Sequence, residues 1–407
     1  MPPLHTAPYR ALLLLPPAPA SSTYASLKAA YHAPLSNVLR ELRRTQEPTL
    51  LEIALPCPHL YGHLDEARGP LYDATQQLVA DVYKLICIIA AKDAIDTEDA
   101  EGVDARVILV AHPRDGKLQH LSEDSTPEQE LQGPAISLHT LAQGARKWST
   151  VYSVESEEGE RLSKSFLAIS KDTKVSRVRG GVVVNASASD STTATAVKKD
   201  YYPTMKHMSV AVGGTFDHLH IGHKLLLTMF AFVLGRRQQS DNASVLTVGI
   251  TGDALLVNKK FADQLESWKA RQEATHSFLH SIVYFGQPDD NRVQIKEVDE
   301  PGPNGHAVHV SYPFGLTIRY VEIWDPFGPT ITDKEITALA LSLETRGGGA
   351  AVNEKRREQG WDPLEVYEVA VLDASEEGSV DETFQSKLSS TEIRRKRSEL
   401  IKPRAKA

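Results

Sequence analysis

The segment that most constrains the fold lies just past the middle of the chain, where a strand-length apolar run meets a helix-length one. The run MSVAV at 208–212 leads through GGTFDHLHIGH at 213–223 into KLLLTMFAFVL at 224–234. A glycine pair at such a joint lets the backbone turn sharply and approach another molecule, because no Cβ stands in the way. The sequence therefore predicts a strand, a turn and a helix, which is the repeating unit of an α/β sheet.

The C-terminal half alternates between strand and helix patterns throughout. We expect this order to give a doubly wound, Rossmann-like parallel sheet with helices on both faces and ligands beyond the carboxyl ends of the strands. The polar segment 287–312 should be an exposed insertion, and Gly360 should end a helix. The expected strands are 207–213, 245–250, 316–324, 338–344 and 364–372, and the expected helices are 221–235, 261–284, 349–359 and 391–400.

The N-terminal half has a similar alternation and is expected to form an α/β domain, but no motif in it indicates chemistry. Its histidines at 5, 32, 59 and 63 are scattered, so we expect ordinary surface or core side chains. Structural support is its expected role, and partner binding is the alternative. The expected strands are 11–16, 49–55 and 105–112, the helices 24–44 and 71–90, and the exposed loops 125–133 and 153–164.

Small polar residues separate the two halves. The stretch VNASASDSTTATAVKKDYYP at 184–203 has neither a helical nor a strand period, which is typical of a linker. We therefore predict a domain over 1–181, a flexible linker over 182–203 and a second domain over 204–407. Both halves fall within the usual range of domain sizes.

Composition narrows the class of protein. Hydrophobic residues make up 41% and charged residues 24%, as in soluble globular proteins, and the net charge of −8 argues against nucleic acid as a partner. Two cysteines, Cys57 and Cys87, exclude a disulfide framework and favour a reducing compartment. No apolar stretch approaches membrane-spanning length. We expect a cytoplasmic protein; the absence of acidic residues before Glu41 leaves a mitochondrial location as an alternative, and the nucleus is another.

The glycine joint has the features of an anion site. Gly213 and Gly214 free the backbone, and the start of the next helix offers unpaired N–H groups at the positive end of its dipole. Thr215 adds a hydroxyl. His220 and His223 are three residues apart, so they share one face of the first helical turn and can donate to phosphate oxygens. A glycine pair alone is common, but this combination indicates function.

Zinc is the alternative ligand for the two histidines. A catalytic zinc site usually takes three protein ligands, and only Asp217 and His218 are near in sequence. We therefore expect phosphate here and no metal held by the protein.

A second constellation is KLSSTEIRRKRSEL at 387–400. Ser389 and Glu392 fit a capping box, which would suit a capped surface helix. Three hydroxyl residues at a helix start, Ser389, Ser390 and Thr391, with Arg394 in the first turn, also fit a second phosphate site. Two such sites facing one cleft would hold a polyphosphate from both sides.

These motifs resemble the signatures of the His-x-Gly-His nucleotidyltransferases. Three further stretches narrow the resemblance to the eukaryotic phosphopantetheine adenylyltransferases of the fungal, monofunctional type. They are VGITGDALLVNKK at 248–260, IWDPFGPTITD at 323–333 and SLETRGGGAAVNEKRREQGW at 342–361. The resemblance covers nearly all of 205–400 and none of the N-terminal half.

The resemblance implies transfer of AMP from ATP to 4′-phosphopantetheine, giving dephospho-CoA and pyrophosphate in coenzyme A synthesis. The acceptor phosphate is itself the nucleophile, so alignment and charge stabilisation are what the enzyme must supply. Mg²⁺ is expected to be held mainly by the ATP phosphates.

The resemblance also implies roles for individual residues. ATP would be bound by Gly213, Gly214, Thr215, Phe216, His220, His223, Ser389, Ser390, Thr391 and Arg394. The acceptor would meet Thr215, Lys259, Glu344, Thr345 and Arg346. The catalytic set would be His220, His223, Lys259 and Arg394, with Lys260 the next candidate if Lys259 is not the lysine near the acceptor phosphate.

Two alternatives come from other functions. A cytidylyltransferase for phosphoethanolamine or phosphocholine would share the first motif, but its second motif differs from FQSKLSSTEIR. A catalytically idle scaffold of the coenzyme A pathway would not need both histidines. The chain contains no Gly-x-x-x-x-Gly-Lys-Ser/Thr loop, so we expect a separate dephospho-CoA kinase, which is a candidate partner along with other enzymes of the pathway.

Overall fold

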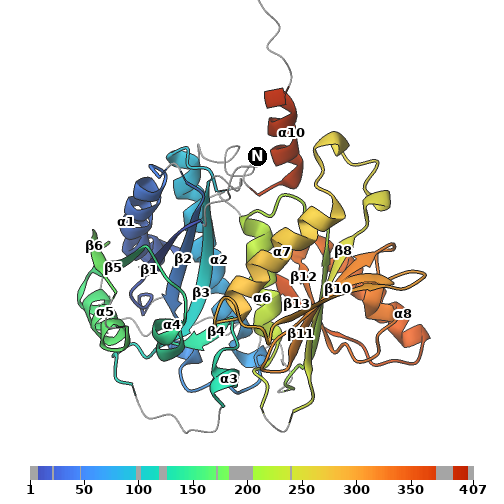
Figure 1. Ribbon diagram of the computed structural model, residues 1–407, viewed down its shortest axis with the longest axis horizontal. Helices are drawn as coiled ribbons and strands as arrows, with labels where there is room; N and C mark the ends of the chain where they lie inside the picture. Colours follow the sequence, from blue (N-terminus) through green and yellow to red (C-terminus); the bar gives the residue numbers. More distant parts are fainter. Residues whose placement is uncertain are drawn as a thin grey trace, which may run out of the picture. The chain divides into compact units, whose positions relative to one another are not determined.

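The computed structural model describes residues 8–20, 23–45, 47–97, 102–118, 126–170, 173–182, 205–238, 241–372 and 388–401 (Figure 1). These residues form two compact units, one mostly before residue 205 and one mostly after it. Nearly all of the linker predicted at 182–203 lies outside the described residues.

The first unit is a parallel α/β layer. Its six-stranded sheet has the order β4-β3-β2-β1-β5-β6, and every neighbouring pair is parallel. Strands buried on both faces read as continuous apolar runs. The elements are β1 (Tyr9–Leu14), α1 (Tyr24–Leu42), β2 (Thr49–Pro56), α2 (Gly69–Lys92), β3 (Val103–Ala111), α3 (Pro127–Glu130), β4 (Ala135–Ser137), α4 (Leu138–Gln143), β5 (Thr150–Glu155), α5 (Glu157–Ile169) and β6 (Val175–Arg179).

The α/β prediction for the first half is confirmed, but the loop expected at 153–164 is wrong. That stretch ends β5 and begins α5. The Ser156 hydroxyl caps α5 by accepting from the Gly159 amide at 3.0 Å. Glutamates occupy the first helical turn, where their negative charges interact favourably with the positive end of the helix dipole. The acidic run that indicated a loop is therefore the start of a helix. The segment 125–133 likewise contains the short helix α3.

The expectation that no apolar stretch approaches membrane-spanning length is wrong for helix α2. By length and composition it is apolar enough to cross a membrane. Most of that span is buried inside the protein, including Val79, Leu85 and Ile89. It therefore has the surroundings of a core helix.

The second unit has the predicted Rossmann-like order. Five parallel strands run β13-β12-β7-β8-β11, with α6 and α7 on one side and α8 on the other (Figure 1). Gly360 ends α8 in the left-handed region at φ 72°, as expected. The elements are β7 (Ser209–Gly214), α6 (Ile221–Val233), β8 (Ser244–Thr251), α7 (Trp268–Val283), β9 (Gln294–Asp299), β10 (His306–Ser311), β11 (Leu316–Ile323), β12 (Ala338–Ser342), α8 (Arg346–Glu358), β13 (Glu365–Val369) and α10 (Ser390–Ile401).

The segment 287–312 differs from the expected loop-like insertion. It contains β9 and β10, which form an antiparallel hairpin on the free side of β11. Nearly all of β9 is exposed, but Ala307 and Val310 of β10 are buried. The sheet is therefore mixed, with seven strands.

The two units share the order of five parallel strands but differ beyond β3 and β11, since β4 is parallel to β3 and β10 is antiparallel to β11. Read from β6, the first sheet runs β6-β5-β1-β2-β3-β4, and the second runs β13-β12-β7-β8-β11-β10-β9. In each sheet the first strand of the unit lies at the point where the strand order reverses, where doubly wound proteins bind their ligands. Thr23 is the N-cap of α1 in the first unit, and His220 is the N-cap of α6 in the second.

The loops at these two equivalent points differ in chemistry. After β1 the chain reads LPPAP at 15–19, and all five residues are buried. Proline has no amide hydrogen, so only Leu15 and Ala18 of this loop have main-chain donors, and the Leu15 amide already donates to the Ala54 carbonyl. The Pro16 carbonyl is bound by the Tyr31 hydroxyl at 2.6 Å, which fixes the loop internally.

A short piece of the first half belongs to the second unit. Residues 126–134 are grouped with it, as are 65–68. The Gly133 amide donates to the Val283 carbonyl at 2.9 Å, and the Phe285 amide donates to the Leu131 carbonyl at 3.0 Å. The end of α7 is therefore paired with a segment from before the linker.

Candidate active site

The signature segment forms a compact turn between β7 and α6. Phe216 and His218 adopt the left-handed conformation, at φ 52° and 47°, whereas the glycines do not. Gly214 is needed for a close approach, because a Cβ there would stand 3.0 Å from the Phe216 ring. A Cβ at Gly213 would meet no atom within 4 Å, so the space beside it is open.

His220 and His223 form a stacked pair at the start of α6. Their ring centroids are 3.8 Å apart, with 20° between the planes. Gly222 makes room for the stack, since a Cβ there would lie 3.2 Å from the His220 ring. No side chain caps the N-terminus of α6. The first turn therefore presents main-chain N–H groups and two imidazoles together.

Both histidines are held in the neutral form. Burial lowers the pKa of His223 to about 4, and burial followed by the neighbouring His223 lowers the pKa of His220 well below its usual value. Each Nδ1 atom is buried without a hydrogen-bond partner among the described residues. At neutral pH the pair can therefore donate hydrogen bonds without carrying a net charge.

Helix α10 begins beside this turn, although more than 160 residues of sequence separate them. The Ser390 hydroxyl donates to the Asp217 carbonyl at 2.8 Å. The Ser389 hydroxyl accepts from the Glu392 amide at 3.4 Å, as the capping pattern predicts. Two helix N-termini thus lie next to one another in the second unit. Such ends favour anions.

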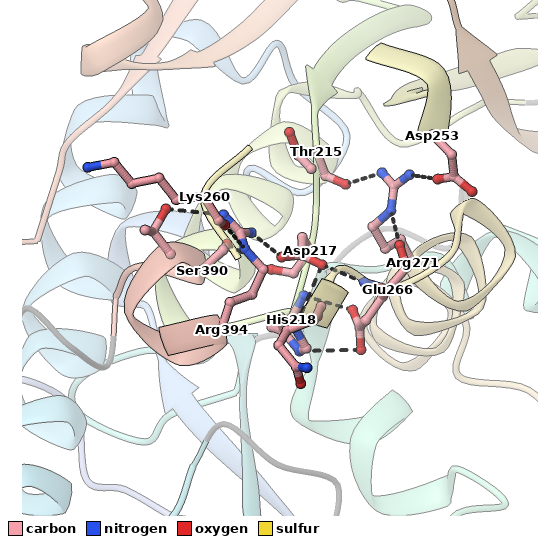
Figure 2. A network of polar contacts seen from close by, with 11 residues as sticks. Thr215, Asp217, His218, Asp253, Lys260, Glu266, Arg271, Ser390 and Arg394 are labelled. Atoms are coloured by element: carbon pink, nitrogen blue, oxygen red, sulfur yellow. Dashed lines mark hydrogen bonds and ion pairs between the residues drawn. The ribbon is translucent and has the colours of Figure 1, made fainter. Parts of the chain in front are cut away.

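Asp217 joins three segments, and the sequence analysis gave it no role beyond the zinc alternative. Its side chain is completely buried. One oxygen accepts from the Glu266 amide at 3.0 Å and the other is paired with the buried Arg394 guanidinium (Figure 2). Arg394 also donates to the Lys260 carbonyl at 3.0 Å and to the Thr391 hydroxyl at 3.2 Å. Arg394 therefore does not project freely into solvent, as it would on a simple surface helix.

Arg271 is a second buried clamp that the sequence did not reveal. Its guanidinium donates to the carbonyls of Thr215 at 2.7 Å and Thr251 at 2.8 Å, and to the Asp253 carboxylate at 2.6 Å (Figure 2). It thereby ties together the loops that follow β7 and β8. Its position within α7 gave no signal, because arginines are common in helices that face solvent.

The described residues contain one cluster with potential metal ligands, formed by Asp217, His218 and Glu266. These groups already bind one another and their surroundings. His218 Nε2 donates to the Gln264 carbonyl at 2.8 Å, and Glu266 accepts from the His218 amide at 2.7 Å. Both Asp217 oxygens are occupied as well. Among the described residues only His218 Nδ1 in this cluster lacks a hydrogen-bond partner, at 3.6 Å from the Glu266 carboxylate. The other groups are held in a hydrogen-bond network.

A pocket of about 370 Å³ adjoins the signature turn within the second unit. It lies at the reversal point between β7 and β12, beneath the start of α8. Its lining is apolar and glycine-rich, and includes Gly213, Gly214, Phe327, Thr345, Gly348 and Gly349.

The remaining predicted residues are placed less centrally. Glu344 is exposed and does not line the pocket. Arg346 is exposed and pairs with Glu368, with Nε 2.6 Å from the carboxylate. Lys259 is exposed on the turn after β8, where its amide donates to the Leu256 carbonyl. Of the predicted acceptor contacts, the structure brings Thr215 and Thr345 nearest to the turn and the pocket.

Comparison with known proteins gives relatives for part of the chain. A protein of Saccharomyces cerevisiae named phosphopantetheine adenylyltransferase is 36% identical over 185 residues, covering 46% of this chain and 47% of that protein. One of the same name from Pyrobaculum aerophilum is 28% identical and covers 47% of this chain and 92% of that protein. The chain is related to the phosphopantetheine adenylyltransferases over about half its length.

Three further matches carry no function in their names. An uncharacterized protein of Schizosaccharomyces pombe is 33% identical over 250 residues, covering 61% of this chain and 64% of that protein. Residues 1–184 match the model of a domain of unknown function. A crystal structure of a protein of unknown function from Archaeoglobus fulgidus matches with a TM-score of 0.27 and 22% identity, over 40% of this chain and 99% of that one. The chain thus spans about half to two thirds of the yeast relatives.

Proposed function

We propose that the chain is a pantetheine-phosphate adenylyltransferase. The observation that carries the proposal is the neutral pair His220 and His223 at the start of α6, which lies beside the hydroxyl-bearing start of α10. Such an arrangement suits a chain of phosphates. The relatedness to adenylyltransferases supports a nucleotidyltransferase in coenzyme A synthesis, and ATP with 4′-phosphopantetheine as the substrates.

In the proposed reaction an oxygen of the acceptor phosphate attacks the α-phosphorus of ATP. The new bond joins this oxygen to the α-phosphorus, and the bond from the α-phosphorus to the bridging oxygen breaks, releasing pyrophosphate. No proton needs to be removed from the nucleophile, and no covalent enzyme intermediate forms. The protein aligns two anions and stabilises the charge that develops between them.

Each group of residues would have a separate role, set by its position in the site. His220, His223 and the α6 amides would contact the ATP phosphates, with His223 strengthening its contact as charge develops. Ser389, Ser390 and Thr391 with Arg394 would hold the β- and γ-phosphates, which form the leaving pyrophosphate. Lys259 would approach the acceptor phosphate. Mg²⁺ would arrive with ATP, bound mainly by the phosphates and water.

The pocket beside Gly213 and Gly214 fits the rest of the acceptor. A pantetheine arm is long, uncharged and partly apolar, and the wall formed by Phe327, Gly348 and Gly349 would accept it without a charged partner. We propose that Thr345 lies along this arm. Glu344 and Arg346 would then act at the entrance.

A pyrophosphate-release assay tests the proposal. Wild-type protein with Mg²⁺ should release pyrophosphate from ATP and 4′-phosphopantetheine, and much less from CTP with phosphoethanolamine. His223→Ala should lower kcat far more than it weakens ATP binding. Release from CTP with phosphoethanolamine but not from ATP with 4′-phosphopantetheine would point to a cytidylyltransferase. No release from either pair would favour a pathway scaffold. A cytoplasmic location and a separate dephospho-CoA kinase as partner belong to the same proposal.

A further inference from the structure

We propose that Asp217 is a positioning residue, which sets the geometry of the pyrophosphate side of the site without touching the substrates. The inference rests on the proposed function, since it assigns to that reaction a residue that orients the groups holding the leaving phosphates.

Burial of the Asp217 carboxylate has a cost. Asp217 is 0% exposed, and a buried carboxylate is unfavourable unless it is paired and hydrogen-bonded. Here both oxygens have partners, the Glu266 amide and the Arg394 guanidinium. A carboxylate at this depth therefore indicates a requirement for its contacts rather than for its bulk.

The contacts of Asp217 connect segments that lie far apart in the sequence. The Glu266 amide belongs to the loop before α7, and Arg394 belongs to α10. Through its Nε atom, Arg394 extends the connection to the Lys260 carbonyl at 3.0 Å. The Asp217 carbonyl accepts from Ser390 at 2.8 Å. One residue thus fixes α10, the turn carrying Lys259 and Lys260, and the signature turn against each other.

The groups around the Asp217 carboxylate determine how it can act. In Figure 2, Asp217 lies between Arg394 on one side and Glu266 with His218 on the other, while the Lys260 side chain extends away. The carboxylate is enclosed by protein groups that donate to it. Its negative charge would repel a phosphate, so a direct substrate contact is unfavourable. Asp217 acts through Arg394, whose charge it orients and partly neutralises.

The experiment compares Asp217→Asn with the wild type in full-length protein. The variant keeps the shape but loses the charge that orients Arg394. We expect kcat to fall about tenfold or more, and KM for ATP to stay the same or decrease, because a repelling charge is gone. A role in stability alone would leave kcat unchanged in protein that is folded at the assay temperature, and that result would overturn the proposal. A rise in KM for ATP that accounts for the whole loss of kcat/KM would also overturn it.

Arg395→Ala is the matched control. Arg395 lies on the same helix, but its side chain is 40% exposed, and its ion pairs among the described residues are all within the helix, with Glu392 and Glu399. Its loss removes the same charge from α10 without touching Asp217, so kcat should match the wild type. A loss equal to that of Asp217→Asn would attribute the effect to the general charge of the helix and overturn the proposal.

Hydrogen exchange gives a readout that does not need the proposed reaction. In Asp217→Asn the amides of 259–266 and 390–394 should exchange faster, with β8 and β12 unchanged. Uniform loss of protection across the second unit would mean that Asp217 is simply a core residue, and would overturn the proposal. If wild-type protein releases no pyrophosphate but the local exchange pattern is observed, the proposed function fails while the positioning contacts stand.

Discussion

Gly222 offers a test of the histidine pair at the scale of one residue. Alanine there would place a Cβ 3.2 Å from the His220 ring, which must shift by a few tenths of an ångström. We expect kcat to fall about tenfold, because small displacements of a phosphate-binding group are costly. The helix itself should gain up to about 1 kcal/mol from the substitution.

Gly347→Ala is the control for this substitution. It makes the same change in a helix, but its Cβ would meet no atom within 4 Å. Steady-state kinetics and thermal unfolding of both variants separate the effects. Equal kcat values in the two variants would show that the spacing of the stack is not critical.

The lowered pKa of His223 predicts that the stability of the protein depends on pH. Burial lowers its pKa to about 4, whereas an unfolded histidine has a pKa near 6.5. The folded state therefore favours the neutral ring. Its contribution is fully present above pH 6.5 and is lost as the pH falls toward 4.

Thermal unfolding between pH 7.5 and 4.5 measures this contribution. His223→Gln, which cannot titrate, should lose less stability than the wild type as the pH falls. Identical decreases in Tm for the two proteins would show that His223 is protonated as easily in the folded state as in the unfolded one.

At the scale of elements, the start of α8 forms one wall of the pocket. Gly348 lines it and a Cβ there would meet nothing within 4 Å, so a larger side chain would project into open space. Gly348→Val should raise KM for 4′-phosphopantetheine by about tenfold through loss of the volume for the arm. KM for ATP should change little.

Gly347→Val again provides the comparison, because Gly347 precedes Gly348 but does not line the pocket. Both variants introduce a β-branched residue into the same helical turn. Initial rates at varied acceptor concentration should therefore separate them. An unchanged KM in Gly348→Val would move the acceptor arm elsewhere.

The elements that the sequence predicted well are those with local signals. The strand–turn–helix at β7 and α6 and the capped start of α10 follow from apolar runs, glycines and hydroxyl residues. The hairpin of β9 and β10 was missed because β9 is exposed and carries almost no apolar pattern. The pairing of Asp217 with Arg394 joins residues 177 positions apart. No local pattern could reveal it, although Asp217 stands inside the signature itself.

At the scale of the whole molecule, the boundary between the halves is not a simple cut. A chain lacking residues 1–190 keeps every motif of the proposed site, so it should retain measurable pyrophosphate release. It also loses the partners of Val283 and Phe285 at the end of α7. Unpaired main-chain groups are destabilising, so we expect a lower Tm than for the second unit in the full chain.

Rate and unfolding temperature of the shortened chain check this prediction. A folded product without any activity would mean that the first half contributes to catalysis. A product with unchanged thermal stability would mean that the contacts of 131–133 are dispensable.

The prolines after β1 bear on how many nucleotides one molecule can hold. The chain contains the same order of five parallel strands twice, but LPPAP at the first reversal point has no amide hydrogen at Pro16, Pro17 or Pro19. Thr23 occupies the cap position that His220 occupies in the other unit. Calorimetric titration with a non-hydrolysable ATP analogue should therefore reach its end point at a molar ratio of one. We therefore expect a nucleotide at the glycine and histidine loop of the second unit, and none at the proline loop of the first.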